Sequence, residues 1–139
     1  MSSLVVMGDS AATGIGDPAG EGIYKGWGHY LFKALPKVKE YHNLSRPGAR
    51  VNEMATVQLE IALEIKPKIA IFIIGGNDVL RNNFNPTNMY AELAESIERL
   101  REVGVDVYAM NLHDPTRVIP LPGVLKKVLT RRVEAVNKI

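Results

Sequence analysis

Residues 4–10 read LVVMGDS, and this segment indicates the fold class most directly. Its first four residues are apolar without interruption, as in a strand of a parallel sheet that helices cover on both faces. A glycine, an aspartate and a serine then end the apolar run. The stretch therefore predicts a buried parallel strand whose carboxyl end opens into a turn that carries Ser10.

Three further strand candidates follow, at residues 41–44, 69–74 and 105–110. Apolar residues at helical spacing lie between these runs and after the last one, which predicts a helix after each strand. The clearest helix has Asn85 as its N-cap, Pro86 at its first position and Gly104 beyond its end. The residues of its expected buried stripe are Tyr90, Leu93, Ala94, Ile97 and Leu100.

Alternating strands and helices predict a three-layer α/β/α fold, a doubly wound, flavodoxin-like parallel sheet with right-handed crossovers. We expect the strand order 2-1-3-4 and a single domain over residues 1–139. The switch point then lies between the first and third strands, and ligands bind there, outside the carboxyl ends of the strands. The last predicted helix runs to Ile139 with no cap and no fifth strand after it. We therefore interpret the domain as truncated after its fourth strand and helix, and incomplete at its C-terminus.

The composition excludes several classes of function. With 46% hydrophobic residues, 23% charged residues and a formal charge of +2, the chain is typical of a soluble globular protein. No basic run with interleaved aromatic residues indicates nucleic-acid binding, and the lack of cysteine excludes disulfides and thiol chemistry. The apolar run at residues 4–7 is too short for a signal peptide or a membrane span. We therefore expect no membrane span and a cytoplasmic location.

Three loops that follow strands carry the candidate chemistry. Ser10 directly follows the first strand, where a serine on its own would more often cap the next turn. It is not alone, because Gly48 follows the second strand and Asn77 follows two glycines after the third. A nucleophile combined with backbone and amide N–H donors is what acyl transfer requires, since the donors stabilise the developing oxyanion. We therefore predict an acyl-transfer site at this edge of the sheet.

These segments resemble the first three conserved blocks of the SGNH (GDSL) hydrolases: Gly8-Asp9-Ser10, then Gly48, then Gly75-Gly76-Asn77-Asp78. The resemblance covers nearly the whole chain and implies an esterase or lipase that cleaves carboxylic esters or related acyl bonds of small molecules, with no cofactor and no metal. It implies Ser10 as the nucleophile. The implied oxyanion hole consists of the Ser10 N–H, the Gly48 N–H and the Asn77 side chain, while Asp9 and Asp78 brace the loops.

The family's fourth block, Asp-x-x-His, supplies the general base and does not occur in these 139 residues. Without a base a serine hydroxyl is a poor nucleophile, so we expect residues 1–139 alone to be nearly inactive. His113, after the fourth strand, is a remote substitute, two strand spacings or about 10 Å from the strand of Ser10. Otherwise the base would arrive on a C-terminal segment beside the fourth strand, or the chain would self-associate through that edge.

Two other classes of function stay open. Asp9 and Asp78 follow neighbouring strands, where two carboxylates could hold Mg²⁺ for phosphotransfer, as in receiver-like domains. Such domains carry consecutive acidic residues after the first strand, a pattern that this sequence lacks. The other class is a non-catalytic binding domain on the same scaffold, although the intact Ser10 and Asn77 argue against a decayed enzyme.

Overall fold

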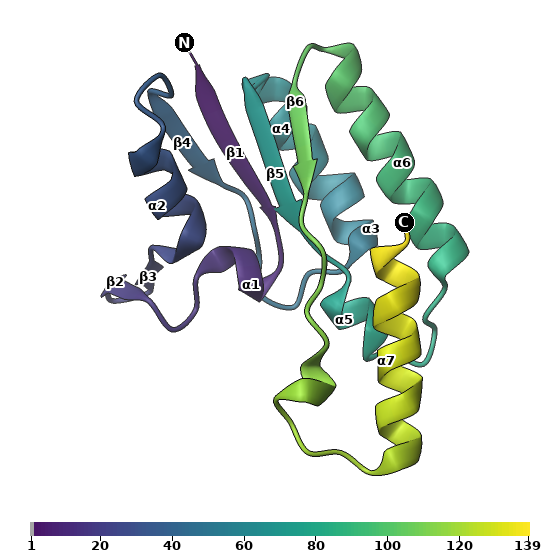
Figure 1. The fold of residues 1–139 in the computed structure, drawn as a ribbon. Coiled ribbons are helices and arrows are strands. Elements are labelled where there is room, and N and C mark those ends of the chain that lie inside the picture. The colour runs from purple at the N-terminus through teal and green to yellow at the C-terminus, as the bar shows by residue number, and fades with distance from the viewer. Residues whose placement is uncertain (1) are drawn as a thin grey trace.

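A computed structural model describes residues 2–139 of the protein. Four parallel strands form its central sheet. Strand β1 (Ser3–Gly8) lies between β4 (Glu40–Asn43) and β5 (Ile69–Ile73), and β6 (Asp106–Ala109) pairs with the other side of β5 (Figure 1). The order is therefore second, first, third and fourth of these strands, which confirms the prediction. Each strand also matches its predicted run to within one residue at either end.

Helices cover both faces of the sheet, as the doubly wound prediction requires. Leu4 and Val6 of β1 belong to a core shared with α2 (Gly26–Ala34), whereas Val5 and Met7 face the opposite core. The main helices that supply residues to this opposite core are α3 (Val51–Glu53), α4 (Leu59–Ile65), α6 (Pro86–Glu102) and α7 (Gly123–Asn137) (Figure 1).

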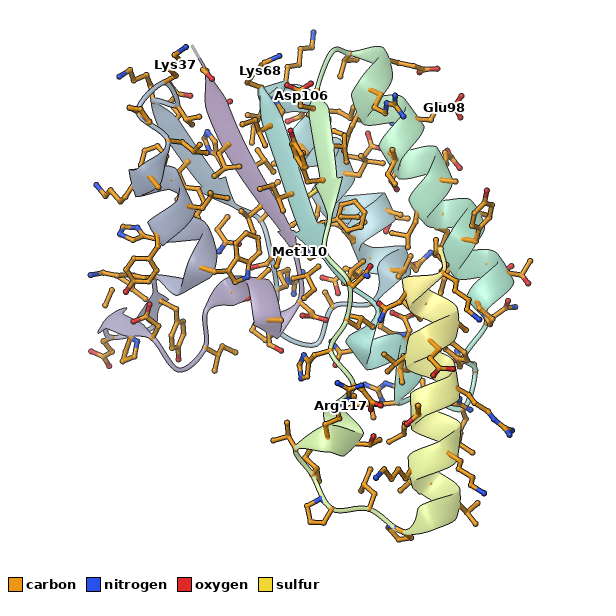
Figure 2. The ribbon with its side chains drawn as sticks, viewed as in Figure 1. Lys37, Lys68, Glu98, Asp106, Met110 and Arg117 are labelled. Carbon is orange, nitrogen blue, oxygen red and sulfur yellow. The ribbon has the colours of Figure 1, made fainter. Side chains whose placement is uncertain are left out.

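The carboxyl ends of the four parallel strands lie at one edge of the sheet. Lys68 and Asp106 form a 3.0 Å ion pair at the amino ends of β5 and β6. Figure 2 labels both residues, and Met110 at the carboxyl end of β6. The short helices α1 (Ser10–Thr13) and α5 (Gly76–Val79) begin at this carboxyl edge. The segments that carry Ser10 and Asn77 therefore lie together where the sequence predicts a site.

Two features between the strands differ from the prediction. The helix predicted after the second strand contains a π-helical stretch, η1 (Met54–Gln58), between α3 and α4. Such stretches frequently lie at functional sites. A small antiparallel hairpin of β2 (Pro18–Gly20) and β3 (Ile23–Tyr24) also stands apart from the main sheet, and its residues are exposed. Because its residues are exposed, no apolar pattern in the sequence predicts this hairpin.

Helix α6 has the predicted ends but only part of the predicted stripe. The Asn85 side chain accepts a hydrogen bond from the Asn88 N–H, and Gly104 has a φ of +83° beyond the last turn. Of the expected stripe, Leu93 and Leu100 are buried, but Tyr90 and Ala94 are exposed. The helix instead buries Met89 and Ser96, so its contact face is rotated from the one that the apolar pattern predicts.

Helix α7 follows a long connection that contains the 3₁₀ turn η2 (Pro115–Arg117). It buries Leu129, Val133 and Val136 against the core, and its first turns extend beyond the carboxyl edge of the sheet (Figure 1). Among residues 2–139, no helix is both long enough and apolar enough to cross a membrane.

Candidate active site

Ser10 lies at the first position of α1, immediately after the buried strand β1. Asp9 has an extended backbone and serves as the N-cap, with its Oδ1 accepting a hydrogen bond from the Ala11 N–H at 2.9 Å. The chain turns so sharply here that Asp9 is buried while Ser10 is exposed. The Ser10 hydroxyl is therefore accessible at the carboxyl end of the first strand, as predicted.

Gly8 and Gln58 fix the position of this turn. Gly8 has a φ of +137°, and a Cβ at this position would collide with the carbonyl oxygen of Ile73, so only glycine fits. The buried Gln58 side chain accepts a hydrogen bond from the Gly8 N–H at 2.7 Å and donates one to the Gly8 carbonyl at 2.9 Å. Sequence reasoning missed Gln58, although a glutamine between apolar residues of an amphipathic helix is a signal that could have found it.

Other side chains hold the short helix that carries Ser10. The Trp27 Nε1–H donates to the Ala11 carbonyl at 3.0 Å, and the Asn43 Nδ2–H donates to the Ala12 carbonyl at 2.9 Å. Carbonyls at the end of a helix lack partners within it, so these bonds stabilise an element that is too short to stand alone. The nucleophile candidate thus rests on a turn that is bonded on several sides.

Asn77 lies in α5, directly after β5. Its Nδ2 donates a hydrogen bond to the Ala49 carbonyl at 3.0 Å. An amide nitrogen carries two N–H groups, so this bond orients the side chain and leaves the second N–H for a substrate oxygen. Gly48, with a φ of +81°, directly precedes Ala49. The Asn77 side chain therefore ties the loop that contains Gly48 to the end of β5.

The two aspartates are both buried and both bonded to the chain. Asp78 accepts hydrogen bonds from the Val51 N–H at 3.1 Å and from Arg50 Nε at 3.2 Å. Burial raises the pKa of Asp9 above its ordinary value, and the charge of Asp78 raises it further, while the Ala11 N–H opposes both. Within residues 2–139, no three His, Cys, Asp or Glu side chains are grouped so that they could hold a metal ion.

A cavity of about 590 Å³ opens beside Ser10, and Asp9, Asn77 and His113 also line it. In the described part of the chain, no hydrogen bond joins the Ser10 hydroxyl to an imidazole. Gly48 lines a separate cavity together with Arg50 and Asp78. The structure therefore brings Ser10, Asp9, Asn77 and His113 to one cavity. Gly48 and Asp78 line the neighbouring cavity.

Fold and cavity together define a class of protein: a doubly wound α/β/α domain that holds a cavity at the carboxyl ends of its parallel strands. More specifically, the chain belongs to the GDSL-like lipase/acylhydrolase family, whose model matches residues 6–139. The resemblance to SGNH hydrolases that the three segments suggested is thereby confirmed. Members of this family hydrolyse esters, so the expected substrates are small-molecule esters.

Solved structures share this fold. TesA is 25% identical, with a TM-score of 0.73 over 97% of this chain and 72% of that one. The acetyl xylan esterase AlAXEase is 14% identical, with a TM-score of 0.74 over 98% and 71% of the two chains. The acetylxylan esterase Axe2 from Geobacillus stearothermophilus is 18% identical, with a TM-score of 0.70 over 99% and 70%. A search of curated proteins gives no match.

Proposed function

We propose that Ser10 is the nucleophile of this esterase and that hydrolysis passes through an acyl-Ser10 intermediate. The observation that carries the proposal is that Ser10 and Asn77, from two adjacent strand ends, line one cavity in a member of an acylhydrolase family. A hydroxyl suits attack on an ester carbonyl, and an oriented amide N–H suits stabilisation of the oxyanion that forms.

In the first half of the proposed reaction, the Ser10 Oγ attacks the ester carbonyl carbon while a general base takes the hydroxyl proton. The carbonyl oxygen becomes an oxyanion, and we assign its donors to the Ser10 N–H, the Gly48 N–H and Asn77 Nδ2. The tetrahedral species then expels the alcohol, which receives the proton from the base. Water attacks acyl-Ser10 in the same way, releases the carboxylic acid and restores the hydroxyl.

We assign the general base to a residue outside positions 1–139, because these residues contain no Asp-x-x-His and span about 72% of TesA. His113 is the second candidate, since it lines the cavity of Ser10. Residues 1–139 then form one domain that completes its site with a further segment. The outer edge of β6, where Tyr108 is 57% exposed, is the place where we expect that segment to pair.

The nucleophile is tested by Ser10→Ala, which should abolish hydrolysis of p-nitrophenyl esters and labelling by a fluorophosphonate while the circular dichroism spectrum stays unchanged. Ser2→Ala, at the opposite end of β1, is the matched control and should keep both properties. Activity that survives Ser10→Ala would overturn the assignment. Stoichiometric labelling of Asp9 or Asp78 by acetyl phosphate with Mg²⁺ would support phosphotransfer instead.

The base is tested by the pH profile of kcat. If it lies outside residues 1–139, His113→Gln should leave kcat and its pH profile unchanged in the intact protein. Residues 1–139 expressed alone should then hydrolyse esters only slowly and associate through the β6 edge in light scattering. Full activity of a monomeric 1–139 chain that His113→Gln abolishes would assign the base to His113.

A further inference from the structure

The cavity beside Ser10 extends away from the polar site into an apolar chamber. Its walls beyond Ser10 and Asn77 consist mainly of aliphatic side chains from the loop after α5, from the connection after β6 and from α7. The main residues are Leu80, Leu112, Ile119, Leu121, Leu125 and Val128. Its volume of about 590 Å³ lies within the range of about 300–1,000 Å³ that is typical of sites for small organic molecules.

Specific hydrogen bonds fix the outer wall of this chamber. Arg132 on α7 donates from Nη1 to the Val79 and Arg81 carbonyls, both at 2.9 Å, and its guanidinium lies 5.0 Å from the centre of the Phe84 ring. These contacts tie α7 to the end of α5, which carries Asn77. The apolar wall is therefore anchored to the same element as the proposed oxyanion donor.

A second set of bonds ties α7 to the connection after β6. Thr130 donates to Asp114 Oδ2 at 3.0 Å, and the Asn137 side chain bonds both the N–H and the carbonyl of Leu112, at 2.7 and 2.8 Å. The chamber is thus a built feature of the fold, because hydrogen bonds join the connection after β6 to α7 both midway along the helix, at Thr130, and at its last residue, Asn137.

We propose that this chamber holds the acyl chain of the substrate, so that the enzyme prefers medium-length aliphatic acyl groups to acetyl. The inference rests on the proposed role of Ser10. An apolar wall offers few partners for the hydroxyls of a polar substrate, whose burial without hydrogen bonds is unfavourable. Each methylene that it removes from water favours binding about fourfold. The acyl group also stays bonded to Ser10 when the alcohol leaves. A chamber that begins at Ser10 can therefore hold the acyl chain throughout the reaction.

Binding to a Ser10→Ala variant tests the chamber independently of hydrolysis. Octanoate should bind and raise the melting temperature, whereas acetate at the same concentration should have no effect. Val128→Trp, which fills the chamber, and Leu125→Gln, which makes its wall polar at a residue that is already 46% exposed, should each remove the octanoate effect. Val124→Trp is the matched control: Val124 lies on the same helix, is 80% exposed and does not line the chamber.

Kinetics of the intact enzyme supply the second arm. With p-nitrophenyl esters, kcat/KM should rise from acetate to octanoate by on the order of 100-fold or more. Val128→Trp should remove this rise, so that the octanoate ester is hydrolysed no faster than the acetate, whereas Val124→Trp should keep it. Octanoate that binds no better than acetate, or a preference that survives both chamber variants, would overturn the proposal. A preference that follows the alcohol chain at constant acetyl would do the same. Tight octanoate binding without any hydrolysis would instead overturn only the role of Ser10.

Discussion

The buried Gln58 gives the sharpest test of how the fold positions Ser10. Strand β4 ends at Asn43, so the sheet no longer provides a partner for the Gly8 N–H, and the Gln58 carbonyl oxygen takes that place at 2.7 Å. Gln58→Met keeps the side-chain volume and removes both hydrogen bonds. Gly8 is two residues before Ser10, so a change in this contact acts directly on the turn that carries the proposed nucleophile.

The size of the expected loss in unfolding free energy depends on which groups lose a hydrogen-bond partner. The Gly8 carbonyl keeps a second hydrogen bond, from the Arg46 N–H at 3.0 Å, whereas its N–H is left buried without an acceptor. One unsatisfied buried donor costs about 1–3 kcal/mol of unfolding free energy. Since the volume is conserved, little cavity cost adds to it. We expect the urea midpoint to fall accordingly with an unchanged m-value.

Activity separates a positioning role from a purely structural one. A displaced turn should lower kcat by roughly 10- to 100-fold with little change in KM, because the geometry of attack is lost and the binding chamber is not. Gln58→Glu provides the conservative variant: a carboxylate accepts from the Gly8 N–H but repels its carbonyl, whereas the protonated acid makes both bonds. Its stability deficit should therefore shrink in acid, and that of Gln58→Met should not.

Val57→Met, at an exposed neighbour in the same π-helical stretch, is the control for the new side chain. It should match the unmodified protein in both stability and kcat. Gln58 has no positioning role if the Gln58→Met protein keeps its kcat and its unfolding free energy lies within about 0.5 kcal/mol of the original, the usual range for surface substitutions.

Three further predictions concern the polar groups around the cavity. Asn77→Ala should lower kcat roughly 100- to 1,000-fold with little change in KM, because the amide meets charge that develops only in the transition state. Burial raises the pKa of Asp9, so the stability of the fold should decline as pH rises from the unfolded pKa of this carboxyl through its folded pKa. Asp9→Asn keeps the cap on the Ala11 N–H and should flatten this decline in the urea midpoints. Hydrogen bonds from Thr116, and then from Thr130, lower the pKa of Asp114. The stabilisation by its charged form should therefore be present above the ordinary carboxyl pKa and be lost as pH falls through the lowered pKa. Asp114→Ala should remove this pH dependence.

The strands and the two central site residues were predictable because both depend on short stretches of sequence. The uninterrupted apolar run before Gly8 identifies a buried strand, and parallel strands bring their carboxyl ends to one edge, which places Ser10 and Asn77 together. The contact face of α6 was not predictable in the same way. Ser96 is buried because its hydroxyl bonds the Glu92 carbonyl at 2.7 Å, and Tyr90 is exposed although it is apolar. The spacing of apolar residues predicts neither the burial of Ser96 nor the exposure of Tyr90.

Residues that act at long sequence separation were missed for a different reason. Gln58 bonds a residue 50 positions away, and Arg132 bonds carbonyls 51 and 53 positions away. Neither belongs to a motif, and each is informative only once the fold brings its partner near. The acyl chamber was missed for the same reason, because α7 and the connection after β6 become its walls only when they face each other.

At two places on this edge, an amide side chain lies where a strand leaves the sheet. Gln58 pairs with both backbone groups of Gly8 after β1, and Asn137 pairs with both backbone groups of Leu112 after β6. Strand ends must diverge to make room for a substrate, and divergence deprives their N–H and carbonyl groups of partners. A carboxamide carries the same donor and acceptor as a peptide group, so it satisfies both without another strand. The sheet can therefore open at its carboxyl edge and still keep the turn before Ser10 rigid.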